Sequence, residues 1–160
     1  MSEKAKYTAP QIAKWFIKRA NSEEIEDGVF EGITNLKLQK IVYFAQAASL
    51  GITGKPLFDD DIEAWKYGPV IPSVYHIYKE NKNNPIPTPD DVPEFDSDTE
   101  RLLSDIWDIF GGASASHLVE ETHKHKPWKD AYNGGNGEGS VISQDSLRLF
   151  YQNVFSIKED

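Results

Sequence analysis

The sequence predicts a mainly α-helical fold: a single-domain bundle of six to seven helices around a central helix, with at most a short β-hairpin-like pairing. Two observations lead to this prediction. Residues 36–50 are apolar around most of their helical circumference, which is typical of a helix in the middle of a domain. The segments around it repeat a helix-start pattern, in which Ser or Thr precedes apolar residues at helical spacing.

The first predicted helix begins after Thr8. Thr8 and Gln11 fit a capping box, in which the threonine accepts a backbone hydrogen bond and the glutamine reaches back to the cap. Apolar residues then recur at helical spacing, and we expect the helix to fade near Glu24. Residues 25–33 contain two glycines and are expected to form a loop.

The central helix is predicted to start at Thr34 and to end at Gly51, which has the residue type that most often terminates a helix. Its main apolar stripe consists of Leu38, Ile41, Val42 and Ala45. A second apolar stripe lies beside the first, so little of the circumference is left for solvent. We therefore expect the other elements to pack around this helix.

The middle of the chain is predicted to contain the β-structure. Residues 62–67 alternate in a way that suits a short strand, and Gly68-Pro69 suits a turn. A helix is expected from about Pro72 to Lys82. Residues 83–97 are rich in Pro and acidic residues, and we expect an acidic surface linker within one domain that spans residues 1–160. Ile86 is the candidate for a brief pairing with the 62–66 segment.

Three further helices are predicted in the rest of the chain, from Ser97 on. Ser97 starts the first of them through a second capping box, and either Ser114 or Ser116 caps the next, which ends before Pro127. Residues 127–132 suit one further helical turn, and Ser143 caps the last helix.

Composition narrows the classes of function. The chain has 160 residues, a net charge of −9 and no cysteine, which excludes disulfides, thiol catalysis and Cys-ligated zinc. It shows neither a signal peptide nor a membrane-spanning run, so we expect a cytoplasmic, soluble protein. An acidic domain without a basic stripe is a poor candidate for direct nucleic-acid binding, whereas a basic protein partner suits its charge.

Two clusters that suggest ligand chemistry are weak. The glycine-rich stretch 133–140 lacks the dinucleotide fingerprint and the Walker pattern, so a mobile loop is favoured. His117, Glu120, Glu121 and His123 are the residues that a metal-dependent enzyme could use. On one helix, however, His117 and His123 point about 120° apart, so a structural or solvated role is favoured.

Aromatic and amide side chains form the remaining candidate site. They are Gln39, Lys40, Tyr43 and Gln46 on the central helix, and Trp65, Tyr67 and Tyr75 around the Gly68-Pro69 turn. Tyr and Trp beside a few polar groups are typical of protein interfaces. Core aromatics with satisfied polar ends would give the same pattern, and the two interpretations have equal weight.

Several stretches together resemble a known family. They are residues 36–40 (LKLQK), 43–47 (YFAQA), 56–58 (PLF) and 63–70 (EAWKYGPV), followed by Ser114-Ala115-Ser116, Leu118, Thr122-His123 and Pro127-Trp128. They look like the signature of the Panacea domain, the SocA-like antitoxin family, long described as a domain of unknown function or as phage-associated protein. The resemblance covers about Tyr7 to Tyr151. One departure is Ala48-Ser49, where many members have an aromatic residue.

The resemblance implies a mostly helical antitoxin of a toxin–antitoxin system that neutralises a co-encoded protein toxin by direct binding. It implies no enzymatic activity, no cofactor and no metal. The residues expected to contribute to the partner-binding surface are Gln39, Lys40, Tyr43, Trp65, Tyr67 and His123. Two alternatives remain: a metal-dependent enzyme that uses the His117 cluster, and an adaptor that delivers its partner to a protease.

Overall fold

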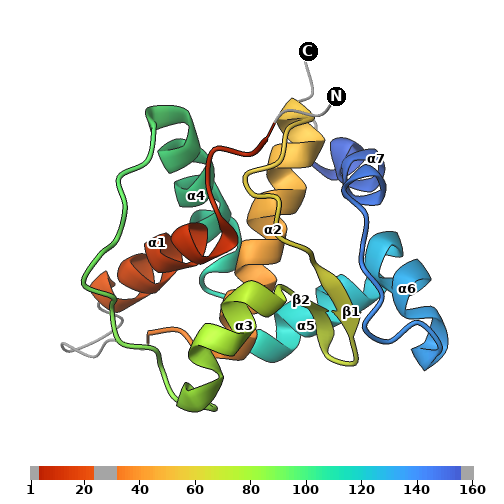
Figure 1. Cartoon of the computed structure of the whole chain (residues 1–160), viewed down its shortest axis with the longest axis horizontal. Helices are drawn as coiled ribbons and strands as arrows, with labels where there is room; N and C mark the ends of the chain where they lie inside the picture. Colours follow the sequence, from red (N-terminus) through yellow and green to blue (C-terminus); the bar gives the residue numbers. More distant parts are fainter. Residues whose placement is uncertain (1–3, 24–31, 156–160) are drawn as a thin grey trace.

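Helix α2 (Asn35–Thr53) runs through the middle of the molecule, with α1 and α4 on one side and α6 and α7 on the other (Figure 1). The computed structural model describes residues 4–23 and 32–155. Within them, α2 contacts α1, α3, α4, α5, α7 and one strand of the hairpin. The predicted mainly α-helical bundle around a central helix is therefore confirmed, and the described residues contain seven α-helices.

The other elements follow in chain order. The α-helices are α1 (Ala9–Ser22), α3 (Pro72–Tyr78), α4 (Ser97–Phe110), α5 (Ala115–Lys124), α6 (Lys126–Tyr132) and α7 (Gln144–Val154). The strands are β1 (Glu63–Trp65) and β2 (Gly68–Val70), and two 3₁₀ turns are η1 (Lys79–Asn81) and η2 (Asn133–Gly135). The helix predicted to run to Lys82 thus changes to a 3₁₀ turn after Tyr78. Most of the loop predicted at 25–33 lies outside the described residues.

Local capping chemistry sets most helix starts. The predicted caps Thr8, Thr34, Ser114 and Ser143 are confirmed, and each side chain accepts a hydrogen bond from the backbone three residues on. Helix α4 differs by one residue, because Asp96 rather than Ser97 caps it. The Asp96 carboxylate accepts from the Thr99 backbone and hydroxyl, and the Tyr7 hydroxyl donates to it. These hydrogen bonds, that of Tyr7 first, lower the pKa of Asp96 to about 2.

The predicted end of the central helix at Gly51 is wrong. Helix α2 continues to Thr53 and ends at Gly54, whose φ of 76° is the left-handed conformation that favours glycine. Gly51 has another role. A Cβ at this position would lie 2.7 Å from the backbone carbon and oxygen of Tyr151, so the glycine lets α7 approach α2 closely.

Strands β1 and β2 form an antiparallel hairpin in which Trp65 lies opposite Gly68. The predicted pairing of this region with Ile86 is wrong, because the Ile86 backbone N–H donates to the Ile33 carbonyl instead. The neighbour of β1 is the chain after the glycine-rich stretch. The Ile142 N–H donates to the Ile62 carbonyl, and Glu63 pairs with Val141 in an isolated antiparallel β-bridge.

Residues 83–97, the predicted acidic surface linker, cross the outside of α1 without forming a strand. Lys14 forms an ion pair of 2.9 Å with Asp91, and the Asn21 amide donates to the Ile86 carbonyl at 2.9 Å. Further along, this segment leads into the Asp96 cap of α4. The segment therefore connects η1 to α4 across the surface, and these two contacts attach it to α1.

In the part of the chain that the structure describes, every helix is too short or too polar to cross a membrane.

Gly51→Ala should destabilise the fold by about 1 to 3 kcal/mol, because the new methyl group meets the Tyr151 backbone, which cannot rotate away. Urea unfolding measures this effect. Gly112→Ala is the matched control: a Cβ there meets nothing within 4 Å, and φ is not positive. Equal stabilities of the two variants would contradict the close approach of α7.

Candidate functional site

The structure places the six predicted site residues in two settings. Gln39, Lys40 and Tyr43 lie on α2 and are buried, with at most 1 % of each residue exposed. Trp65, Tyr67 and His123 lie on the hairpin and on α5, where they are half-buried or exposed. Only the second group can touch a partner without a change in the fold.

Gln39 holds the end of the hairpin against α2. Its side-chain nitrogen donates to Asn35 at 2.8 Å, and its oxygen accepts the Ile71 backbone N–H at 2.9 Å. Gln46 lies two helical turns further along the same face and binds the segment before the hairpin. Its side-chain oxygen accepts from the Leu57 N–H, and its nitrogen donates to the Phe58 carbonyl. Both amides thus form hydrogen bonds with buried backbone groups of residues that lie outside the helices.

Lys40 lies under the hairpin turn. Its ammonium donates to the Pro69 carbonyl at 2.9 Å, and the side chain is fully buried. Gly68 permits this contact: its φ is 101°, and a Cβ there would lie 2.9 Å from Lys40 Cε and 2.8 Å from Thr122 Oγ1. Because burial disfavours the charged form, the pKa of Lys40 falls to about 7.

Tyr43 belongs to a buried chain of polar groups between α2, α5 and α7. Its hydroxyl shares a hydrogen bond of 2.8 Å with that of Tyr151, which in turn lies 2.8 Å from His125 Nδ1. Burial raises the pKa of Tyr43 and lowers that of His125, whereas nearby Glu121 raises the pKa of His125. Sequence analysis missed Tyr151 as a partner, because nothing local connects residues 108 positions apart.

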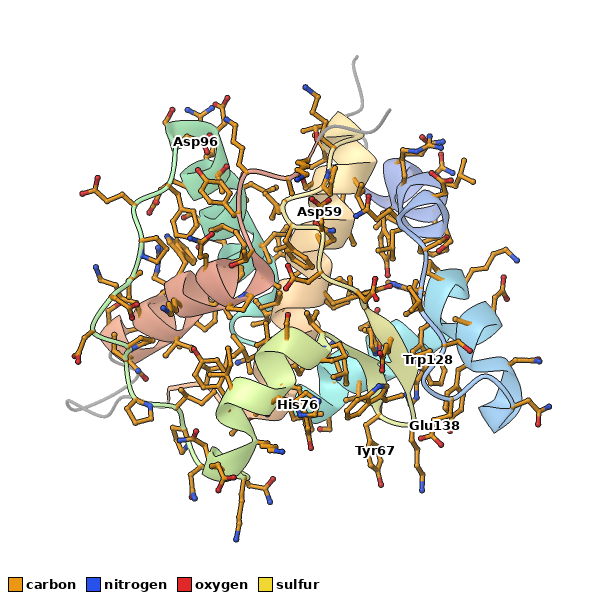
Figure 2. The ribbon with its side chains drawn as sticks, in the orientation of Figure 1. Asp59, Tyr67, His76, Asp96, Trp128 and Glu138 are labelled. Atoms are coloured by element: carbon orange, nitrogen blue, oxygen red, sulfur yellow. The ribbon has the colours of Figure 1, made fainter. Side chains whose placement is uncertain are left out.

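The outside of the hairpin carries the accessible aromatic groups. Tyr67 is 61 % exposed and extends away from the hairpin (Figure 2), with the Lys66 ammonium 5.6 Å from its ring centre. Trp65 is half-buried, and its backbone carbonyl accepts the indole N–H of Trp128 at 2.9 Å. The hairpin is therefore fastened to α6 beneath its exposed tip.

His123 lies beside this hairpin rather than with the other histidines. Its ring stacks on Trp128 with the ring centres 4.0 Å apart, and Trp128 stacks on Tyr132 at 4.6 Å. Nε2 of His123 is buried and has no hydrogen-bond partner among the residues that the structure describes. Burial lowers the pKa of His123, the backbone of Lys66 raises it, and Lys40 lowers it. Trp128 belongs to the family motif but was not predicted as a site residue, although it stacks on His123 and donates a hydrogen bond to Trp65.

The residues of the metal-dependent alternative do not converge. One carboxylate oxygen of Glu121 lies 4.0 Å from Nε2 of His117, and the other lies 4.0 Å from Nε2 of His125, while His123 stacks on Trp128. Within residues 4–23 and 32–155, no group of three or more His, Asp or Glu side chains is arranged to hold a metal ion. These positions give that alternative no support.

Lys40→Met should change how stability depends on pH. The folded pKa near 7 lies below the ordinary 10.5, so between these values the unfolded chain binds the additional proton. The free energy of unfolding of the wild type should therefore rise relative to the variant by about 1.4 kcal/mol per pH unit from about pH 7.5 to 10. Urea unfolding over this range measures it, with Lys18→Met at an exposed site as control. A pH-independent difference would contradict a buried, neutralised Lys40.

Comparisons with known proteins agree with the resemblance seen in the sequence. Over 115 residues the chain is 35% identical to the protein named Antitoxin SocA from Caulobacter vibrioides (strain NA1000 / CB15N), an alignment that covers 64% of this chain. The aligned part is 61% of that relative's length. No solved structure matches the chain. Residues 38–129, which include most of α2, the hairpin and α5, match the family described as Antitoxin SocA-like, Panacea domain. This match covers more than half of the chain, which therefore belongs to the SocA-like, Panacea domain family.

Proposed function

We propose that this protein is an antitoxin that neutralises a co-encoded protein toxin by binding it directly. The observation that carries the proposal is the family match over residues 38–129, supported by the relative named Antitoxin SocA. Neutralisation by binding requires no catalysed reaction, so we propose that the protein is not an enzyme and uses no cofactor. We also propose that it acts in the cytoplasm, where its toxin is made.

The hairpin tip is the surface we assign to the toxin. Tyr67 supplies a large, exposed aromatic side chain. Trp65 lies opposite Gly68 at the hairpin turn, and His123 lies next to the Lys66 backbone. Tyrosine and tryptophan are the residue types on which binding energy concentrates in protein interfaces. The tip is also rigid at its base, because Trp128 donates to Trp65. A fixed loop loses less conformational entropy on binding than a free one.

The buried members of the predicted site act through this hairpin. Lys40 holds the Pro69 carbonyl and Gln39 holds the Ile71 N–H, so both set the position of β2 from within. Tyr43 lies further along α2 and ties it to α7. We therefore propose two roles within the predicted set: contact for Trp65, Tyr67 and His123, and positioning for Gln39, Lys40 and Tyr43.

Co-expression with the gene product encoded beside this chain tests the function. The neighbouring product alone should stop growth, and co-expression should restore it and yield a complex that copurifies. Partner levels measured after synthesis is stopped separate two mechanisms: a stable partner supports occlusion, and rapid loss supports delivery to a protease. A harmless neighbour, or two proteins that do not associate, would refute the antitoxin proposal.

Tyr67→Ala tests the surface. Because the side chain is largely exposed, the variant should keep its free energy of unfolding within about 0.5 kcal/mol. Toxin binding should weaken by about 2 kcal/mol or more, as for a central aromatic contact. Ile109→Ala is the matched control, since Ile109 on α4 is also 61 % exposed. Equal binding by the two variants, measured by calorimetry, would remove the hairpin tip from the interface.

A further inference from the structure

Charge is unevenly distributed along this acidic chain. Helix α1 carries Lys14, Lys18 and Arg19 and no acidic residue. Residues 83–100 carry six acidic residues and no basic one. The two segments lie against each other, and Lys14 and Asp91 already form an ion pair where they cross. Of the other charged residues in the two segments, Lys18, Arg19, Glu94 and Glu100 line one groove.

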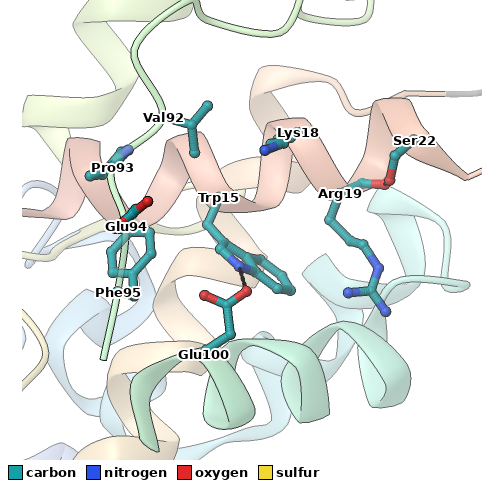
Figure 3. Close-up of a pocket in the computed structure, with 9 residues that line it drawn as sticks. All are labelled: Trp15, Lys18, Arg19, Ser22, Val92, Pro93, Glu94, Phe95 and Glu100. Atoms are coloured by element: carbon teal, nitrogen blue, oxygen red, sulfur yellow. Dashed lines mark hydrogen bonds between the residues drawn. The ribbon is translucent and has the colours of Figure 1, made fainter. Parts of the chain in front are cut away.

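This space is a groove of about 530 Å³ between α1, the start of α4 and residues 92–95. Figure 3 shows Glu94 and Phe95 at one end, Lys18 and Arg19 at the other, and Trp15 between them. The indole N–H of Trp15 donates to Glu100 at 2.8 Å, which fixes the ring as the middle of the groove. The groove therefore has an acidic end, an aromatic middle and a basic end.

The basic end is partly prepared for an anion. Arg19 is held through Nε by Glu23 at 3.1 Å, and its guanidinium carbon lies 5.5 Å from the centre of the Trp15 ring. This arrangement leaves the two terminal nitrogens of Arg19 available. Lys18 is exposed and forms no ion pair with another described residue. An acidic group here would meet the Lys18 ammonium and the terminal nitrogens of Arg19, whose Nε already pairs with Glu23.

The other wall suits an extended chain. Residues 92–95 form neither a helix nor a strand, and their backbone makes no hydrogen bond to another described residue. Their C=O groups and the N–H groups of Val92, Glu94 and Phe95 are thus available to a second extended segment, as in strand addition, whereas Pro93 has no N–H. Glu94 is exposed and forms no ion pair within the described chain, while Val92 and Phe95 give this wall an apolar part.

We propose that this groove is a second contact surface for the toxin, and that it binds an extended segment with an acidic and a basic group on either side of an apolar side chain. The proposal rests on the antitoxin function proposed above. The acidic group pairs with Lys18 and Arg19, and the basic group pairs with Glu94. The apolar side chain packs on half-buried Phe95 and on the small part of Trp15, 8 %, that is exposed. A nucleic acid has no basic group for the Glu94 end, so the lining favours a protein segment.

A charge swap tests the groove. The variants are Lys18→Glu, Glu94→Lys and the double change, whose net charge equals that of the wild type. The matched controls are Lys79→Glu, Glu80→Lys and their double change on η1, where both side chains are also exposed. Calorimetry with the purified product of the neighbouring gene measures the dissociation constant, and circular dichroism verifies the fold.

Each single groove variant should bind about three- to fivefold more weakly, and the double variant about tenfold or more, because exposed ion pairs are lost at both ends. The η1 controls should stay within about twofold of the wild type. Raising the NaCl concentration from about 0.05 to 0.5 M should reduce the difference in dissociation constant between the groove variants and the wild type, since salt screens exposed charges.

The outcomes separate the two proposals. A double variant that binds as well as the wild type overturns the groove while the antitoxin function stands. An effect of Lys18→Glu without one of Glu94→Lys overturns the two-ended segment proposed here. Absence of any complex with the wild-type chain overturns both the groove and the function on which it rests.

Discussion

The burial of every residue of α2 from Leu38 to Leu50 is the constraint on which the rest of the structure depends. The polar side chains of this stretch must find their partners inside the protein, because an unpaired buried group costs about 1 to 3 kcal/mol. Gln39, Lys40 and Gln46 meet this requirement with backbone groups of segments that are not helical. The same bonds determine where those segments lie. The hairpin and the chain before it are therefore placed by the polar residues of the central helix as much as by apolar packing.

The parts of the fold that depend on neighbouring residues were predictable from the sequence. Caps such as Thr8 and Ser143 act over three residues, and the apolar stripes of α2 indicate burial from periodicity. The helix end predicted at Gly51 was wrong because the role of this glycine depends on Tyr151, a hundred positions away. The backbone of Tyr151 occupies the space that a Cβ of residue 51 would need. The strand pairing predicted for Ile86 was wrong for a similar reason: a single apolar residue in an extended segment does not specify which strand it joins.

The candidate site shows a similar limit. Aromatic and amide residues at an interface and in a satisfied core have the same composition, so sequence reasoning could not divide them. Accessibility divides them residue by residue: Tyr43 is buried and Tyr67 is exposed, although both belong to stretches that carry the family resemblance. A family signature of this kind mixes residues that hold a surface in place with residues that form it. Contact by individual residues remains a prediction for the binding experiments.

The close contact of Gly51 with Tyr151 has a consequence for the order in which the protein folds. Helix α7 lies near the end of the chain, and it covers a helix made of residues synthesised much earlier. Pairing over such a sequence separation is slow, because a long loop must close before its contacts form. Until residue 151 has left the ribosome, one apolar side of α2 has no cover, and Tyr43 has no hydroxyl partner. A shortened or newly made chain thus exposes hydrophobic surface to chaperones and proteases, and only the chain that reaches α7 is protected from them.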